Sequence, residues 1–327
     1  MTVRGAGGQP GRPGGSRPVI VVRHLTKRYG PVLAVDDLSF TVAAGQVTGF
    51  LGPNGSGKST TMRMIVGLDA PTAGQVTVDG RSYGQLRFPL REVGALLDAG
   101  AVHPGRTARD HLAWLAASNQ IPSGRVDEVL GIVGLAGAAR SRAGELSLGM
   151  GQRLGIAAAL LGDPPVLIFD EPVNGLDPEG ILWVRKLLQS LAAEGRTVLV
   201  SSHLMSEMAL TADHLIIIGR GRLLAAGTVA EFIERSEGHH VHAQSPDAGA
   251  LTGLLRQKGA TVAADGPESL TVTGMESRDV GILAAQAGLT LYELGTQRAS
   301  LEDAFMELTR EHGEYRAATP APAGTPA

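Results

Sequence analysis

The chain has 327 residues, 43% of them hydrophobic and 19% charged, which is typical of a soluble globular protein and argues against a disordered chain. Its length suggests two structured units, and its formal net charge of −3 gives no general attraction to nucleic acid or anionic lipid. Cysteine is absent, which excludes disulfides, zinc–thiolate sites and thiol nucleophiles.

The two ends of the chain are rich in Gly and Pro and are predicted to be flexible tails, over residues 1–17 and 313–327. The structured region begins with a β-branched run at Pro18–Val22 and two apolar stretches within Leu38–Leu51. A further run at Gln75–Val78 leads into an Asp-Gly turn. These patterns predict that the first structured part of the chain is built from strands.

From Ala108 to Leu161 apolar residues recur three and four positions apart, which predicts helices. Strand and helix patterns then alternate along the segments Val166–Phe169, Pro178–Ala193, Thr197–Val200 and Leu215–Ile218. This alternation indicates an α/β fold with a parallel or mixed sheet and helical crossovers. We expect it to form one domain over residues 18–233.

After about Glu234 the elements become shorter, and the last of them is a helix from Ser300 to about Arg310. Their order is β-α-β-β-α-β, at Val241–Gln244, Ala248–Gln257, Ala260–Ala264, Ser269–Thr273, Val280–Ala287 and Leu289–Leu294. Ser300 is placed to cap the closing helix, and Asp303 suits its dipole. The pattern predicts a small α+β domain over residues 234–312.

The strongest motif fits G-x-x-x-x-G-K-[ST] and consists of Gly52, Pro53, Asn54, Gly55, Ser56, Gly57, Lys58 and Ser59. A strand pattern precedes it and a helical run from Thr60 follows it, as a phosphate-binding loop requires. Glycines let the backbone wrap around an anion, and the N-terminus of the helix adds partial positive charge. Lys58 would then bring a full charge to the β- and γ-phosphates, and Ser59 would offer its hydroxyl to Mg²⁺.

A second motif ends the strand Val166–Phe169, which runs directly into Asp170 and Glu171. In open α/β sheets, ligands bind at the carboxyl ends of the strands. Combined with the phosphate loop, this position predicts that Asp170 holds Mg²⁺ and that Glu171 takes a proton from the attacking water. Lys58 and Glu171 are therefore candidate catalytic residues.

Three further segments give weaker evidence for a functional site when each is considered alone. Ser147 and Gly149 lie at the predicted start of a helix, which is a potential anion site. Asn174–Asp177 closely follows Glu171 and, taken alone, would be interpreted as an ordinary turn. Ser201–His203 follows a strand and is expected at the same sheet edge as Asp170.

In their order and spacing these motifs resemble the nucleotide-binding subunit of ATP-binding cassette (ABC) transporters, over about residues 19–232. The form Leu-Ser-Leu-Gly-Met-x-Gln-Arg and the segment Leu301–Phe305 are most similar to the branch that serves antibiotic and drug exporters of bacteria. The resemblance implies a P-loop ABC cassette, in which a mixed or parallel sheet carries a helical subdomain. It also implies ATP and Mg²⁺ as ligands.

The resemblance assigns roles to single residues. Tyr29 matches the aromatic that stacks on adenine, and His203 matches a catalytic residue that contacts the γ-phosphate. Ser147 and Gly149 match the signature that contacts the nucleotide of the opposite subunit, and Asp177 matches a loop that crosses the dimer interface. Two ATP molecules would therefore be enclosed between two cassettes, in a homodimer or a paired assembly.

Two positions depart from the family pattern. The usual glutamine, which ligates Mg²⁺ and senses the transmembrane partner, aligns with Asp98. A carboxylate offers Mg²⁺ an oxygen, but Asp98 is shorter, adds negative charge and lacks the amide donor, so its role as a metal ligand stays open. The usual Gly-Gly-Gln of the signature is replaced by Leu148-Gly149-Met150, so only Ser147 and Gly149 carry over.

No run of about 18 apolar residues occurs, and no apolar core follows the first charges, so we expect neither a membrane span nor a secretory signal. Transport would then require an integral membrane permease, with this subunit bound peripherally at the cytoplasmic face of the cell membrane. The expected docking surface lies close to Asp98 and includes the segment Ala101–Ala113.

The alternative is a non-transport ABC ATPase that acts on the ribosome or on nucleic acid. Such proteins usually carry two cassettes or a long insert before the signature, whereas this sequence has one phosphate loop and a compact interval between Lys58 and Ser147. It also lacks a basic surplus, so we expect no nucleic-acid partner. A scaffold without turnover is disfavoured because Lys58, Asp170, Glu171 and His203 are all present.

Overall fold

The computed structural model describes residues 18–235, 240–297, 301, 302, 305 and 308, which belong to two compact units. One unit ends at Ala226 and the other begins at Gly227. The predicted tails lie outside the described residues, as do Ser300 and Asp303 of the closing helix. The domain boundary between residues 233 and 234 stays a prediction, because α7 (Val229–Arg235) spans it and the residues that follow are not described.

A six-stranded sheet forms the middle of the first unit, in the order β5-β6-β7-β3-β8-β9. Its strands are β3 (Gln46–Leu51), β5 (Val93–Leu96), β6 (Val166–Asp170), β7 (Thr197–Ser201), β8 (His214–Gly219) and β9 (Arg222–Thr228). The five strands from β5 to β8 in this order are parallel. β3, β6 and β7 are buried along almost their whole length, which is why β6 and β7 are almost continuous apolar runs. Their carboxyl ends meet at one edge of the sheet.

A smaller antiparallel sheet, in the order β2-β1-β4, shares its core with α1 (Lys58–Ile65). Its strands are β1 (Pro18–Tyr29), β2 (Val32–Ala43) and β4 (Ala73–Val78). Ile20 and Phe40 of this sheet are buried in one apolar cluster with Met62 of α1. The rings of Phe40 and Phe50 lie 5.4 Å apart between centroids, so the cluster also reaches β3. This core fixes α1 relative to the strand that precedes it.

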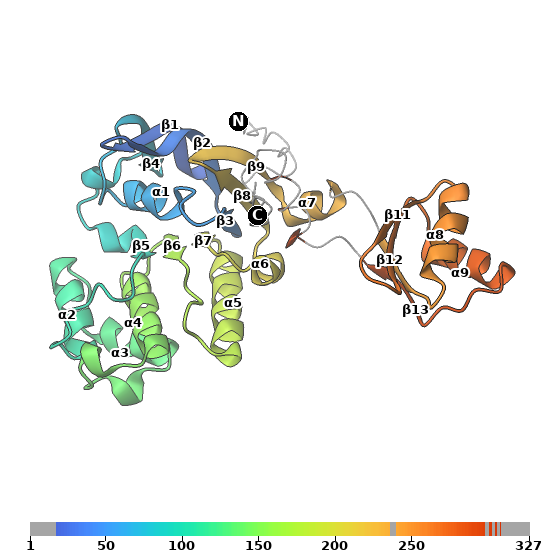
Figure 1. The fold of residues 1–327 in the computed structure, drawn as a ribbon. Coiled ribbons are helices and arrows are strands. Elements are labelled where there is room, and N and C mark those ends of the chain that lie inside the picture. Colours follow the sequence, from blue (N-terminus) through green and yellow to red (C-terminus); the bar gives the residue numbers. More distant parts are fainter. Residues whose placement is uncertain (1–17, 236–239, 298–300, 303–304, 306–307, 309–327) are drawn as a thin grey trace, which may run out of the picture. The chain divides into compact units, whose positions relative to one another are not determined.

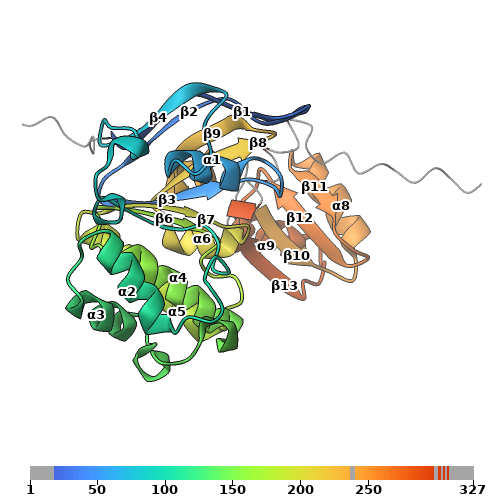
Figure 2. The same cartoon turned by 90° about the vertical axis from the view of Figure 1, so that its left-hand side faces the viewer.

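The segment between β5 and β6 contains three helices that pack against one another, α2 (Ala108–Ser118), α3 (Gly124–Ile132) and α4 (Leu148–Leu160). They lie together and away from β1, β2 and β4 in both views (Figures 1 and 2). This group is the predicted helical subdomain. The remaining elements of the unit are α5 (Pro178–Ala193), α6 (Met205–Thr211) and the 3₁₀ turns η1 (Tyr83–Gln85), η2 (Pro89–Arg91), η3 (Ala136–Ala138) and η4 (Ala143–Glu145). Within the described ranges, no helix is long and apolar enough to cross a membrane.

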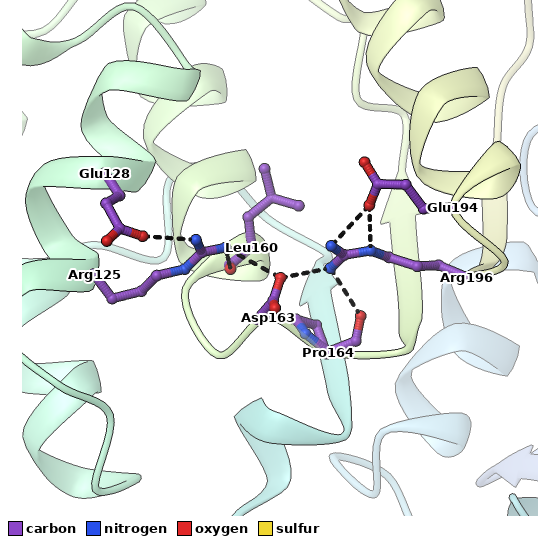
Figure 3. A network of polar contacts seen from close by, with 7 residues as sticks. All are labelled: Arg125, Glu128, Leu160, Asp163, Pro164, Glu194 and Arg196. Carbon is purple, nitrogen blue, oxygen red and sulfur yellow. Dashed lines mark hydrogen bonds and ion pairs between the residues drawn. The ribbon is translucent and has the colours of Figure 1, made fainter.

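A network of ion pairs ties the helical subdomain to the turns that lead into β6 and β7 (Figure 3). Arg125 of α3 donates to the carboxylate of Asp163 at 3.2 Å and to the carbonyl of Leu160 at 3.3 Å. Arg196, directly before β7, lies 2.9 Å from the same Asp163 oxygen and donates to the carbonyl of Pro164 at 3.3 Å. Asp163 is 61% exposed, so each pair contributes at most about 1 kcal/mol, and the main effect is to fix the turn before β6.

The second unit contains a four-stranded antiparallel sheet, in the order β11-β12-β10-β13, with α8 and α9 on one face (Figure 1). Its elements are β10 (His240–Gln244), α8 (Ala248–Gln257), β11 (Thr261–Ala264), β12 (Ser269–Thr273), α9 (Ser277–Gln286) and β13 (Glu293–Gln297). Val241 and Val272 of the sheet are buried in one cluster with Leu251 and Leu255 of α8. The order is the predicted β-α-β-β-α-β.

The predicted fold class is confirmed, but several element limits are wrong. β5 was missed because it has only four residues, and β9 was missed because most of its side chains are exposed. β1 continues to Tyr29, since pairing with β2 supports polar residues that no local pattern marks as strand. The strand predicted from Leu289 starts only at Glu293, because Leu289 and Leu291 pack against the core of the unit before the strand ladder begins.

Candidate functional site

The connection from β3 to α1 is a tight loop over residues 52–57. Gly57 has a φ of 101°, in the region that favours glycine. A Cβ on Gly57 would lie 2.5 Å from the carbonyl oxygen of Ala34, and a Cβ on Gly52 would lie 2.4 Å from that of Ile218. Close packing against neighbouring backbone therefore requires glycine at both positions, and it sets the path of the loop into the N-terminus of α1.

Lys58, the first residue of α1, is buried with its amine turned back onto the loop. Its Nζ donates to the carbonyl of Gly52 at 2.6 Å and to that of Pro53 at 3.2 Å. Burial lowers the pKa of Lys58, whereas the negative charges of Glu171 and Asp170 act to raise it. The Lys58 amine therefore lies between the carbonyls of the loop and the two carboxylates, whose negative charge favours its protonated form.

Asp170 and Glu171 lie at the carboxyl end of β6, beside the end of β7. The Ser201 hydroxyl donates to Asp170 Oδ1 at 2.5 Å and accepts from the N–H of Glu171 at 2.9 Å. Glu171 has a φ of 51°, a left-handed conformation that costs about 1–2 kcal/mol for a residue with a side chain. By bonding to both residues, the Ser201 hydroxyl fixes the Asp170 side chain relative to the main chain of Glu171.

An open pocket of about 230 Å³ brings these groups together. Its lining consists of Ala34, Asn54, Gly55, Gly57, Lys58, Ser59, Thr60, Asp170 and Glu171. β7 separates β3 from β6 in the sheet, so the loop and the acids meet across the end of one strand. Backbone amides, an ammonium group and a helix N-terminus beside two carboxylates can hold a polyanion together with a divalent cation.

His203 follows β7 closely and lies against the Glu171 carboxylate. Its Nδ1 is 2.8 Å from Glu171 Oε2. The side chain of His203 is 50% exposed, whereas that of Glu171 is 20% exposed. His203 does not belong to the lining of the pocket, so the structure places it beside the acid rather than beside the loop.

Tyr29 ends β1, and polar contacts fix its ring. Its hydroxyl donates to Asp69 Oδ2 at 2.8 Å, and Arg63 Nε donates to the same oxygen at 2.7 Å. Lys27 Nζ lies 4.8 Å from the ring centroid. Burial, followed by the bond to Asp69, raises the pKa of Tyr29, while Arg63 and Tyr29 lower the pKa of Asp69. The residue is 45% exposed, so part of Tyr29 stays open to solvent.

Ser147, Gly149 and Asp177 lie at the starts of two helices, outside the lining of the pocket. Ser147 Oγ caps α4 by accepting an N–H of its first turn at 3.3 Å. Asp177 Oδ1 caps α5 in the same way at 2.9 Å. A Cβ on Gly149 would lie 3.2 Å from the carbonyl oxygen of Gly175, so the two segments are in contact. Ser147 and Asp177 stay exposed.

Asp98 is not brought to the pocket. It is exposed in the turn after β5, and its Oδ1 accepts the N–H of Gly100 at 2.8 Å. One carboxylate oxygen is therefore used by the turn in which the residue lies.

Gln152 of α4 is the glutamine of the signature form Leu-Ser-Leu-Gly-Met-x-Gln-Arg, to which the sequence assigned no role. It is 5% exposed, and its Nε2 donates to the carbonyl oxygen of Glu171 at 3.0 Å. A signal was present, because a glutamine on the buried side of a helix, between Leu154 and the cap at Ser147, must find a hydrogen-bond partner.

The fold and the site together define a P-loop nucleotide-binding cassette. A family model described as ABC transporter matches residues 35–174, and one described as a domain of unknown function matches residues 239–302. The chain is 36% identical over 302 residues to an uncharacterised ABC transporter ATP-binding protein, YhcH, of Bacillus subtilis. That match covers 91% of this chain and 98% of the relative.

Two further relatives have named transport roles. The chain is 44% identical over 209 residues to the bacitracin transport ATP-binding protein BcrA of Bacillus licheniformis, covering 63% of this chain and 68% of the relative. It is 36% identical over 295 residues to the Nod factor export ATP-binding protein I of Burkholderia lata, covering 88% and 95%. The dimeric structure of a bacterial ABC transporter cassette is similar at a TM-score of 0.60 and 26% identity, covering 64% of this chain and 98% of that one.

The chain therefore belongs to the ATP-binding proteins of ABC transporters. It is an ATPase subunit, and its fold is that of the family's cassette.

Proposed function

We propose that this subunit binds ATP with Mg²⁺ in the 230 Å³ pocket, hydrolyses it, and in a dimer powers export through an integral membrane permease. The observation that carries the proposal is the pocket, which collects the glycine-rich loop, Lys58 and the two acids from separate elements. Similarity to bacitracin transport and Nod factor export proteins supports a drug, an antibiotic or a lipid-like molecule as cargo. It also favours transport over a role on the ribosome or on nucleic acid.

The loop residues fit the phosphates of ATP. Lys58 Nζ donates to the loop carbonyls of Gly52 and Pro53, from which it can turn to the β- and γ-phosphates. The buried Ser56 hydroxyl has no hydrogen-bond partner within the described part of the chain, which leaves a donor inside the loop. The ring of Tyr29 would stack on adenine. The proposed ATP-binding residues are Tyr29, Gly52, Pro53, Asn54, Gly55, Ser56, Gly57, Lys58, Ser59 and Thr60.

Ser59 and Asp170 fit Mg²⁺, because both line the pocket and their hydroxyl and carboxylate oxygens are the hard ligands that this ion prefers. When bound, Mg²⁺ neutralises negative charge on the phosphates. Asp98 fits less well, since it lies outside the lining of the pocket and one of its oxygens accepts the N–H of Gly100.

Glu171 would act as the general base that takes a proton from the attacking water. Its carboxylate lines the pocket, and the contact with His203 at 2.8 Å restricts its orientation. His203 would also contact the γ-phosphate. A positioned base of this kind contributes a factor of about 10²–10⁴ in rate.

Ser147 and Gly149 support a site shared between two subunits. They lie at the N-terminus of α4, where an anion is favoured, yet outside the pocket of their own chain. We expect the Glu171→Gln variant to dimerise with Mg-ATP, because ATP is bound but not consumed. Ser147→Arg in that variant should keep it monomeric by placing bulk and charge between the subunits. Light scattering measures the mass in each case.

The matched control for this experiment is Ser190→Arg, an exposed position on α5, which should leave the ATP-dependent dimer intact. A Glu171→Gln protein that stays monomeric at saturating Mg-ATP would contradict the shared site. So would a Ser147→Arg variant that dimerises as well as the control.

The proposed partner is an integral membrane permease, with this subunit at the cytoplasmic face of the cell membrane. The helical subdomain offers a surface with the composition of an interface. Trp114 of α2 is 54% exposed, and the Arg106 guanidinium lies 4.7 Å from its ring. Arg109 is exposed nearby and pairs with Asp127 at 2.6 Å. Exposed aromatic and arginine side chains of this kind are enriched in protein interfaces.

We expect Arg106→Glu or Arg109→Glu to weaken co-purification with the candidate permease more than it weakens ATP binding, because neither residue lines the pocket. The control, matched to Arg109, is Arg222→Glu on β9, which removes an exposed arginine paired with the carboxylate of Asp36. Equal losses of permease association and ATP affinity, or a loss of ATP affinity alone, would contradict this docking surface.

A further inference from the structure

The peptide of Glu171 is held from both sides. Its N–H donates to Ser201 Oγ at 2.9 Å, and its carbonyl oxygen accepts from Gln152 Nε2 at 3.0 Å. The φ of 51° lies in the left-handed region, which a residue with a side chain keeps only where its surroundings hold it. Ser201 belongs to β7 and Gln152 to α4, so two separate elements hold the Glu171 peptide in this conformation.

The helix that carries Gln152 is firmly seated. A Cβ on Gly155 of α4 would lie 2.5 Å from Leu96 Cδ1 of β5, and a Cβ on Gly175 would lie 2.3 Å from Leu148 Cδ2 at the helix start. The helix is thus in close contact with its neighbours at both places. One rigid element therefore holds the exposed Ser147 at its N-terminus and the buried Gln152 against Glu171.

We infer that Gln152 is a positioning residue, whose amide holds the Glu171 peptide in the conformation that directs the carboxylate into the pocket. The inference rests on the proposed function. In the proposed dimer, Ser147 would face the nucleotide of the partner, while Gln152 on the same helix contacts the general base of its own chain. Helix α4 would then couple the two ATP sites, because a nucleotide that displaces Ser147 also shifts the bond to Glu171.

The alternative is that Gln152 only satisfies a buried carbonyl. Loss of such a bond lowers the stability of the protein but leaves the turnover of the folded molecules unchanged. Loss of a positioning bond lowers kcat at unchanged ATP affinity, because the misplaced carboxylate acts on the transition state and not on bound ATP. A measurement of kcat and ATP affinity therefore distinguishes a positioning role of Gln152 from a purely structural one.

The test is Gln152→Met in the full chain, which keeps the length and bulk of the side chain, removes the N–H donor and adds no charge. The matched control is Gln189→Met on α5, whose amide makes the same type of bond, to the carbonyl of Leu210 at 3.0 Å, away from the pocket. Misplacement of a catalytic group by about 1 Å costs up to about 10²-fold, so we expect kcat to fall about 10- to 100-fold. ATP affinity should stay unchanged, the Hill coefficient for ATP should fall toward one, and the control should match the wild type.

The same substitution made in the Glu171→Gln protein shows whether the Gln152 amide acts through the Glu171 carboxylate. In Glu171→Gln protein, Gln152→Met should lower the residual rate no further, because the group that it positions is already absent. An additive loss there overturns the inference, and so does a Gln152→Met protein with wild-type kcat. If Gln152→Met does not fold, Gln152→Leu also removes the donor and adds no charge, and a wild-type kcat in that variant overturns the inference equally.

These outcomes are distinct from failure of the proposed function. A wild-type chain without ATPase activity, or an active Glu171→Gln variant, would contradict the proposed function. An inactive Glu171→Gln variant beside a fully active Gln152→Met variant would overturn only the role of Gln152.

Discussion

Glu171→Gln should lower the rate of ATP hydrolysis by about 10²–10⁴, or ~3–5 kcal/mol of activation free energy, while ATP binding is retained. Glutamine has the size of glutamate but cannot accept the proton of the attacking water. The bonds from Gln152 and to Ser201 involve the main chain of Glu171, so the substitution leaves them in place. Removal of a carboxylate from the pocket also reduces repulsion of the phosphates, so affinity should not fall.

Phosphate release in steady state and ATP affinity in the absence of turnover measure the two effects separately. Glu179→Gln is the matched control, because Glu179 lies exposed in the first turn of α5 and does not line the pocket. The control should hydrolyse ATP like the wild type. If Glu171→Gln also hydrolyses ATP at nearly the wild-type rate, Glu171 is not the general base.

The elements that could be predicted from the sequence are those whose cause is local. The loop before Lys58 needs glycine for its φ values and close contacts, and these requirements appear directly as a motif. β6 and β7 are buried on both faces, so their burial leaves a continuous apolar run. Helix α5 matches its predicted limits, Pro178–Ala193, because Asp177 caps it and Pro178 opens it.

What could not be predicted depends on partners that are distant in the sequence. The hydroxyl of Tyr29 is bound by Asp69, which Arg63 also contacts, and no sequence pattern around Tyr29 predicts these contacts. Gln152 reaches the carbonyl of Glu171, an atom that every residue possesses, so the contact leaves no mark on the sequence near Glu171. The exposed strand β9 is held by its neighbour β8 rather than by an alternating pattern of its own.

Lys58→Ala should remove tight ATP binding, with a loss of about 10²-fold or more in affinity. A hydrogen bond to a charged group contributes about 1.5–3 kcal/mol, and the Lys58 ammonium is placed to give more than one to the phosphates. The substitution also removes the bonds from Nζ to the carbonyls of Gly52 and Pro53, so the loop loses its internal support in the free protein. Hydrolysis should fall together with binding, unlike in the Glu171→Gln variant.

The pH dependence of ATP affinity gives a second measure of the same residue. Because burial lowers the pKa of Lys58, the ammonium loses its proton at a lower pH than an ordinary lysine would. ATP affinity should therefore weaken as the pH rises through this lowered pKa, and Lys58→Ala should remove that part of the profile. Lys186→Ala, at an exposed position on α5, is the control and should keep both the affinity and the profile. A Lys58→Ala protein that binds ATP as tightly as this control would rule out the loop as the phosphate site.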